Sequence, residues 1–235
     1  AGPRSRQLLE GVGCDFDLGG GAFPFMSMRE GSVAGISAWV SRISFSGELA
    51  FEISVDANSG LALWEAVMEA GQRFDITPYG TEAMHVLRAE KGYVIVGQDT
   101  DGSVTPFDLG MQWIVSEAKD FIGKRSLSRS DTARDNRKQL VGLLTKDPAH
   151  VLPEGAQLVN APSESRPVPM IGHVSSSYFS ANLKRSIALA LVKGGASRMG
   201  STVYAQLMDG AIVPALITSA VFVDPENERQ RQETA

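Results

Sequence analysis

The glutamate at position 48 is the residue of this sequence whose chemistry is easiest to interpret. It follows Ser46-Gly47 and lies between two segments rich in β-branched and aromatic residues. A glycine allows the chain to turn tightly here, so we expect the Glu48 carboxylate to project from a hairpin into a concave, largely apolar slot. A carboxylate so placed can accept two parallel hydrogen bonds from a planar edge with two N–H donors. A solvated turn glutamate is the alternative, because most Glu side chains lie in water.

No further group of residues forms a known catalytic pattern. The sequence contains no G-x-x-x-x-G-K-[ST], no G-x-S-x-G and no H-E-x-x-H, and Gly19-Gly20-Gly21 does not join a strand to a helix. Cys14 is the single cysteine, and His85, His150 and His173 are far apart in the sequence. We therefore expect no disulfide, no metal site and histidines without a catalytic partner.

Composition narrows the class of protein. Hydrophobic residues make up 43% and charged residues 21% of 235 residues, as in ordinary globular proteins. The net charge of −5 gives no basic face for nucleic acid. The apolar run from Ser186 to Val192 is shorter than the ~20 residues that span a bilayer, so we expect a cytoplasmic protein without a membrane partner. The chain lacks an initiator Met and a helix begins near Arg4, which suggests a fragment.

The elements around Glu48 are predicted from periodicity. Trp39 to Phe45 and Glu48 to Val55 form a hairpin, because apolar and polar residues alternate along the second run. Leu61 to Phe74 has the apolar spacing of an amphipathic helix. A second helix runs from Thr81 to about Lys91, and Gly92 is expected to end it in the left-handed conformation. This order favours an α+β layer.

The residue pattern of the chain changes after a charged connector, Asp131 to Lys138. Before it, Pro106 to Val115 and Ile122 to Ser128 are expected to be short helices. After it come short β-prone runs separated by Gly, Pro, Ser and Asp, which predict an all-β barrel or sandwich. These runs are Gln139 to Leu144, Val168 to Ser175, Ser186 to Val192, Thr202 to Leu207 and Ala211 to Val223. The predicted domains are 1–136 (α+β), 137–225 (β-barrel) and a flexible tail, 226–235.

Four blocks of the sequence, in order, resemble the glycine-cleavage T-protein (aminomethyltransferase) family. They are AGPRSRQLL at the start, RISFSGELAFEI (Arg42 to Ile53), LRAEKGYVIVGQDTDGSVTPFDLGMQW (Leu87 to Trp113) and MIGHVSSSYFSANLKRSIALALV (Met170 to Val192). RKQLVGLLTKDP and FVDPENER are similar to the branch found in the α subunits of heterotetrameric sarcosine oxidases. Lys91-Gly92-Tyr93 lacks the cysteine of the related folate-binding iron–sulfur assembly proteins.

The resemblance implies a folate site. By position in its motif, Glu48 would hold the pterin end of tetrahydrofolate, whose 2-amino group and ring N–H form the planar edge that a carboxylate recognises. Arg88 would lie near the folate, although a helix-surface charge is an equal alternative. Tyr178 is a third candidate, against the alternative of a barrel core residue. For Glu90, Trp64 and Trp113 we expect structural roles: an ion pair for Glu90 and core positions for the tryptophans.

The implied reaction is transfer of the one-carbon unit of oxidised sarcosine, an imine, to tetrahydrofolate, giving 5,10-methylenetetrahydrofolate and glycine. FAD or FMN and NAD would bind elsewhere in the α subunit and on partner subunits (β, γ and δ). The family's catalytic Asp would precede this chain, so the isolated fragment is expected to be inactive. The alternatives are a stand-alone aminomethyltransferase of T-protein type and a folate-binding module without catalysis.

Overall fold

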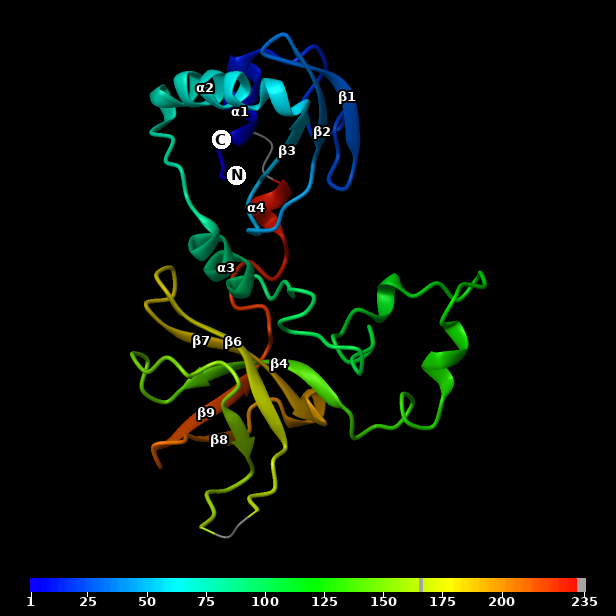
Figure 1. Cartoon of the computed structure of the whole chain (residues 1–235), viewed down its shortest axis with the longest axis vertical. Helices are drawn as coiled ribbons and strands as arrows, with labels where there is room; N and C mark the ends of the chain where they lie inside the picture. Colours follow the sequence, from blue (N-terminus) through cyan, green and yellow to red (C-terminus); the bar gives the residue numbers. More distant parts are fainter. Residues whose placement is uncertain (165–166, 232–235) are drawn as a thin grey trace. The chain divides into compact units, whose positions relative to one another are not determined.

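The computed structural model describes residues 1–164 and 167–231, which fall into two compact units (Figure 1). The first unit consists of residues 1–88 together with the C-terminal segment that starts at Asp224. The second unit is Ala89–Val223. Each unit has its own cluster of buried apolar side chains, so each is described by itself.

The first unit combines helices with a three-stranded antiparallel sheet. Its elements are α1 (Ser5–Val12), β1 (Met28–Val33), β2 (Ile36–Ser41), β3 (Glu52–Val55), α2 (Gly60–Gly71), most of α3 (Thr81–Glu90) and α4 (Glu228–Arg231). The strand order is β1-β2-β3. Phe23, Val33 and Val40 are fully buried in its core, which also includes Leu63 of α2. Short 3-10 turns, Ala57–Ser59 and Gln72–Phe74, flank α2.

The predicted hairpin exists, but its strands are shorter than expected. β2 and β3 pair antiparallel from Ala38↔Val55 to Ser41↔Glu52, and residues 42–51 form an irregular connection instead of a two-residue turn. β1 was not predicted. It pairs with β2 through the Ala34-Gly35 turn, where both residues have positive φ (56° and 73°), as a two-residue turn matched to strand twist requires.

The two predicted helices are present as α2 and α3. Gly92 follows α3 with φ at 74°, as its predicted role at the helix end requires. A side chain at Gly92 would also be strained by contact, because its Cβ would lie 2.6 Å from the Ala220 carbonyl oxygen. Backbone conformation and close packing thus both favour glycine at this position.

The second unit contains a closed barrel of six antiparallel strands. In spatial order they are β4 (Lys138–Thr145), β7 (Arg185–Lys193), β6 (Gly172–Ser180), β5 (Gln157–Val159), β8 (Thr202–Gln206) and β9 (Ile212–Thr218). Val141, Leu158 and Val203 are fully buried in its core. The predicted class, α+β with a C-terminal β-barrel, is confirmed. The short strand β5 was missed, because three residues are too few to show alternation.

Several local expectations differ from the structure. Trp64 and Trp113 are 54% and 79% exposed, so the prediction that they are core residues is wrong. Pro106 to Val115 forms turns with one 3-10 segment (Gln112–Ile114), and Lys124–Ser128 is also 3-10. Residues 131–137 form no helix or strand. Within the predicted tail, residues 228–231 form α4, and residues 232–235 lie outside the described residues.

Among the described residues, no helix has the length and apolar character needed to cross a membrane.

Candidate folate site

The connection that carries Glu48 is shaped by its own polar side chains. Gly47 has a φ of 85°, which glycine adopts without strain. The Gly47 N–H donates to Ser44 Oγ (3.0 Å), and the Glu48 N–H donates to Ser46 Oγ (3.4 Å). Leu49, the next residue, is 1% exposed and anchors the connection in the core. Glu48 is thereby fixed between a glycine turn and a buried side chain.

Arg229 is the ion-pair partner of Glu48. Its Nη1 donates to Glu48 Oε1 at 2.6 Å, and the two residues are 181 positions apart. The Glu48 side chain is 21% exposed and that of Arg229 is 41% exposed. Among the described residues, the structure gives no hydrogen-bond donor to the other oxygen, Oε2, so this carboxylate retains acceptor capacity.

α4 is held in place from two sides, and this fixes Arg229. The Asp224 carboxylate accepts hydrogen bonds from the N–H groups of Glu228 (2.8 Å) and Arg229 (3.2 Å). Arg42, 2% exposed, donates from Nη2 to the Gln230 carbonyl at 2.5 Å. The C-terminal segment is therefore part of the environment of Glu48, which sequence reasoning did not foresee.

Arg42 also joins both ends of the Glu48 connection. It begins the connection, and its Nη1 donates to the carbonyl of Ala50 near the other end (3.1 Å). Its guanidinium lies over the Phe51 ring at 5.2 Å from the ring centre. Arg42 opens the RISFSGELAFEI block, but the sequence alone did not indicate a role for it. The motif position was the signal that could have identified it.

A cavity of about 550 Å³ lies beside this connection in the first unit. Glu48 itself does not line it. The Leu49 carbonyl, however, accepts hydrogen bonds from Gly2 N (2.8 Å) and Ser5 Oγ (2.9 Å), and both of these residues line the cavity. The aromatic residues of its wall are Phe51, Trp64, Phe74 and Tyr79. The cavity is thus concave and aromatic, and the projection of Glu48 into such a slot stays a prediction.

The other two predicted site residues lie elsewhere. Arg88 is in the first unit, on α3, and is fully buried instead of at the helix surface. Tyr178 is in the second unit, on β6, where it packs against buried Ile187 and Leu189. The three candidates therefore come from three different elements. Their roles toward a ligand stay predictions.

Glu90 makes structural hydrogen bonds with neutral groups, whereas the sequence had suggested an ion pair. Its carboxylate accepts hydrogen bonds from Ser180 Oγ and Asn182 Nδ2, both at 2.6 Å. Its carbonyl accepts the N–H groups of Phe222 (2.9 Å) and Val223 (3.0 Å). Neutral donors, instead of a cation, thus satisfy this buried residue.

The remaining candidates for reactive chemistry are weak. No group of three or more His, Cys, Asp or Glu residues in the described part of the chain could hold a metal ion. Burial, together with nearby Asp15 and Glu10, raises the pKa of the Cys14 thiol to about 11, which disfavours the nucleophilic thiolate.

Two protein-family models match the chain. The GCVT N-terminal domain matches residues 1–119, and the glycine cleavage T-protein C-terminal barrel domain matches residues 138–224. The chain belongs to the glycine cleavage T-protein family.

The known relatives include sarcosine oxidase α subunits and aminomethyltransferases. Over 232 residues the chain is 51% identical to sarcosine oxidase subunit alpha of Corynebacterium sp. (strain P-1). The matched region is 97% of this chain and 24% of that protein. It is 30% identical to an aminomethyltransferase of Thermotoga sp. (strain RQ2), covering 94% of this chain and 57% of the relative. The chain therefore spans about a quarter to somewhat over half of these T-protein relatives.

A solved structure supports the fold. The aminomethyltransferase T of the glycine cleavage system from Bartonella henselae matches 94% of this chain with a TM-score of 0.76 at 23% identity, over 57% of that protein. Glu48 and Arg88 lie within the first family match and Tyr178 within the second. Arg229 lies beyond both, so family motifs alone would not have identified the partner of Glu48.

Proposed function

We propose that this chain is the folate-binding part of a larger enzyme of the sarcosine oxidase α-subunit type. That enzyme would transfer the one-carbon unit of oxidised sarcosine to tetrahydrofolate, giving 5,10-methylenetetrahydrofolate and glycine. FAD or FMN and NAD would belong to other parts of the α subunit and to its β, γ and δ partners. The 51% identity to a sarcosine oxidase α subunit, against 30% to an aminomethyltransferase, supports this choice.

The observation that carries the proposal is the hydrogen bonding of the Glu48 carboxylate. One oxygen is engaged by Arg229, and the other retains acceptor capacity toward a ligand. The Arg229 guanidinium compensates the charge of this carboxylate, whose side chain is 21% exposed. A pterin presents two adjacent N–H donors that match such a carboxylate. The neighbouring cavity offers aromatic rings for a flat heterocycle to pack against.

In this proposal the residues of the chain bind and orient. Glu48 fixes the pterin ring, Arg229 fixes Glu48, and Arg42 fixes the connection and α4. Holding two reactants in position can contribute about 7–11 kcal/mol at best to lowering a barrier. We assign no general acid or base to this chain.

The test is calorimetric titration of the chain with tetrahydrofolate, comparing wild type with Glu48→Gln. The glutamine side chain keeps the shape of glutamate, but its amide NH2 would face an N–H donor of the pterin. We therefore expect the affinity for tetrahydrofolate to fall at least about tenfold, as for the loss of one charge-assisted hydrogen bond. Glu52→Gln is the matched control, because Glu52 is exposed four residues further along the same motif. Equal affinities of wild type and Glu48→Gln would remove Glu48 from the site.

A second measurement separates catalysis from binding alone. Formaldehyde and glycine generate the imine, and formation of methylenetetrahydrofolate is compared with and without the chain, because free formaldehyde also reacts unaided. We expect no acceleration by the chain alone. An acceleration that Glu48→Ala abolishes would show that the chain carries a complete catalytic site, as a stand-alone aminomethyltransferase region would.

A further inference from the structure

Two neighbouring strands of the barrel bring a pair of cationic side chains to one place. Lys146 directly follows the end of β4, and Arg185 is the first residue of β7. The strands are antiparallel, with Leu143 opposite Ala188, so the end of β4 lies beside the start of β7. Arg185 Nη2 donates to the carbonyl of Thr145 at 2.7 Å, which holds the guanidinium against the end of β4. Like charges on adjacent strands are unfavourable unless a counter-charge lies between them.

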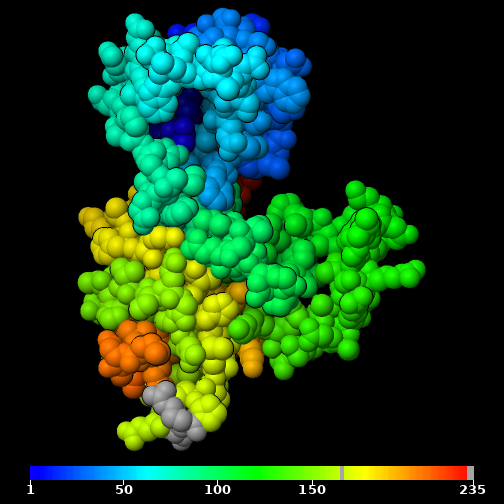
Figure 2. All heavy atoms as spheres, viewed as in Figure 1, coloured from blue at the N-terminus to red at the C-terminus, as the bar shows by residue number. Residues whose placement is uncertain are grey.

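A cavity of about 290 Å³ lies at this end of the strands, and both cations line it. Its wall continues across the barrel, because Leu144 of β4 is opposite Leu216 of β9, which in turn is opposite Thr202 of β8. In Figure 2 the yellow-green segment after β4 lies between the yellow β6–β7 hairpin and the orange β8–β9 hairpin. None of the described residues that line the cavity is acidic. The cavity is thus positively charged and belongs to the second unit alone.

The protein leaves donors of both cations unused. Arg185 Nε is buried and has no hydrogen-bond partner in the described part of the chain. Of the five N–H groups of this guanidinium, the structure pairs one, with a neutral carbonyl. Lys146 is exposed, and its ammonium makes no ion pair with any residue that the structure describes. A buried donor without a partner usually indicates a bound ion, ligand or ordered water.

We infer that this cavity binds a phosphate group, as inorganic phosphate or as part of a small phosphate monoester. A guanidinium offers a planar fork of N–H donors to two oxygens of such a group, and the lysine ammonium adds a point charge. Two cations without a carboxylate favour a doubly charged phosphate over a singly charged carboxylate. The volume is near the lower end of the about 300–1,000 Å³ of small-molecule sites, so only a small ligand fits. The inference does not depend on Glu48 or on folate.

The test is an NMR titration of the whole chain with inorganic phosphate, with the ionic strength held constant by sodium chloride. At about pH 7.5 a phosphate monoester, whose second pKa is about 6, is mostly doubly charged. We expect saturable shifts of the amide signals at the end of β4 and at the starts of β7 and β8. Acetate should bind at least about fivefold more weakly, because it carries one charge.

Glycerol phosphate, a phosphate monoester, is the second arm of the titration. Binding tighter than that of inorganic phosphate would identify a phosphorylated small molecule as the ligand, and weaker binding would identify the free ion. The absence of saturable shifts with both phosphates would overturn the inference. Equal affinities for acetate and phosphate would overturn it as well.

Matched variants identify the site. Lys146→Gln, at an exposed side chain, should weaken phosphate binding about five- to tenfold, and Arg185→Lys should do the same because the fork is lost. Lys193→Gln is the control, because exposed Lys193 ends the same nine-residue strand, β7, outside the cavity. At ~3.3 Å a residue it lies roughly 26 Å from Arg185, beyond the range of screened charges. Unshifted signals elsewhere in the barrel report that each variant is folded. Equal affinities of wild type and a folded Lys146→Gln would overturn the site.

Discussion

At the scale of single residues, the proposed site is one carboxylate and the cations that position it. Glu48 alone would be an ordinary turn glutamate. The Arg229 guanidinium lies 2.6 Å from Glu48, and Arg42 bonds to the Ala50 carbonyl and to the Gln230 carbonyl of α4; these contacts orient the Glu48 carboxylate as an acceptor. Each carboxylate oxygen can accept more than one hydrogen bond, so the contact with Arg229 and the proposed contact with a pterin are compatible. Arg229 is therefore a positioning residue.

We expect Arg229→Ala to weaken tetrahydrofolate binding about three- to tenfold, because Glu48 loses its fixed orientation. Arg229→Lys should recover part of the affinity, since the ammonium keeps the charge but not the planar geometry. The free energy of unfolding should change by less than about 1 kcal/mol, as for a partly exposed ion pair. Calorimetry and urea unfolding check the two expectations. Tighter binding by Arg229→Ala would mean that Arg229 competes with the ligand for Glu48.

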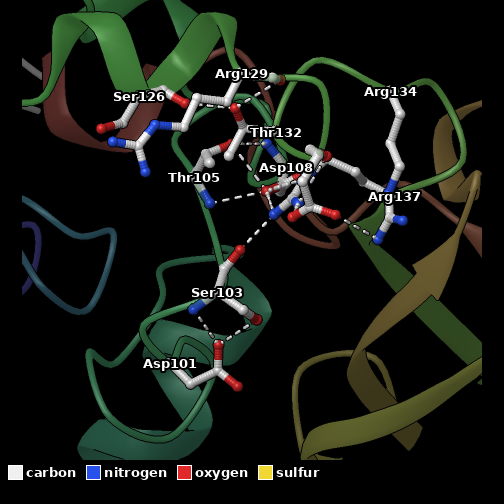
Figure 3. Close-up of polar contacts among 10 residues, drawn as sticks. Asp101, Ser103, Thr105, Asp108, Ser126, Arg129, Thr132, Arg134 and Arg137 are labelled. Carbon is white, nitrogen blue, oxygen red and sulfur yellow. Dashed lines mark hydrogen bonds and ion pairs between the residues drawn. The ribbon is translucent and has the colours of Figure 1, made fainter.

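At the scale of elements, the Asp108–Arg137 contact closes the base of the loop formed by residues 109–136, next to the start of β4 of the barrel (Figure 3). Burial by itself raises the pKa of Asp108, but hydrogen bonds from Arg137 and Thr105 outweigh it and hold the pKa below its ordinary value. A carboxylate whose pKa is depressed on folding contributes stability above its unfolded pKa of about 3.9. That contribution is lost as pH falls from there through the folded pKa.

Asp108→Asn should therefore destabilise the chain by about 3 kcal/mol at pH 7, because the mostly buried Arg137 loses its buried counterion and keeps only the exposed Asp131 at 3.2 Å. The difference from wild type should shrink as pH falls below about 4, because Asp108 of the unfolded wild-type chain then takes up a proton while the folded carboxylate still resists protonation. Urea unfolding at both pH values measures this. Asp120→Asn, at a fully exposed side chain of the same loop, serves as control and should leave the urea midpoint unchanged. The same loss at both pH values would show that shape, not charge, is what matters at Asp108.

At the scale of the whole molecule, two cores stabilise two units. The core of the first unit gathers residues from α1, the sheet and α2, whereas the barrel encloses its own core. The segment from Asp224 returns to the first unit, so that unit is formed from both ends of the chain. Its stability thus depends on contacts that are distant in sequence, such as Arg42 with the Gln230 carbonyl, 188 positions apart.

Phe23→Ala should destabilise the first unit by about 3–5 kcal/mol, because this ring is fully buried and leaves a cavity. Hydrogen exchange should speed up in β1–β3 and α4, while amides in β4–β9 keep their protection. Exchange read by mass spectrometry resolves the two groups of peptides. Parallel loss of protection in the barrel would mean that the chain unfolds as one cooperative unit.

Local patterns in the sequence were sufficient to predict the helices α2 and α3, the β2–β3 pairing, most of the barrel strands and Gly92 at a helix end. Such features depend on residues two to four positions apart, and their periodicity is visible in the sequence. Glu48 could likewise be selected from its turn and its motif.

Only the tertiary structure decided what surrounds these elements. The sequence gives no sign that Arg229 pairs with Glu48, because a charged side chain can find its partner anywhere along the chain. Trp64 and Trp113 were expected in the core on residue type alone, yet their exposure depends on which segments pack over them. Residues 109–136 follow the same rule. Their composition is that of an ordinary connector, and only the structure shows the Asp108–Arg137 contact at their base and the exposure of their apolar side chains.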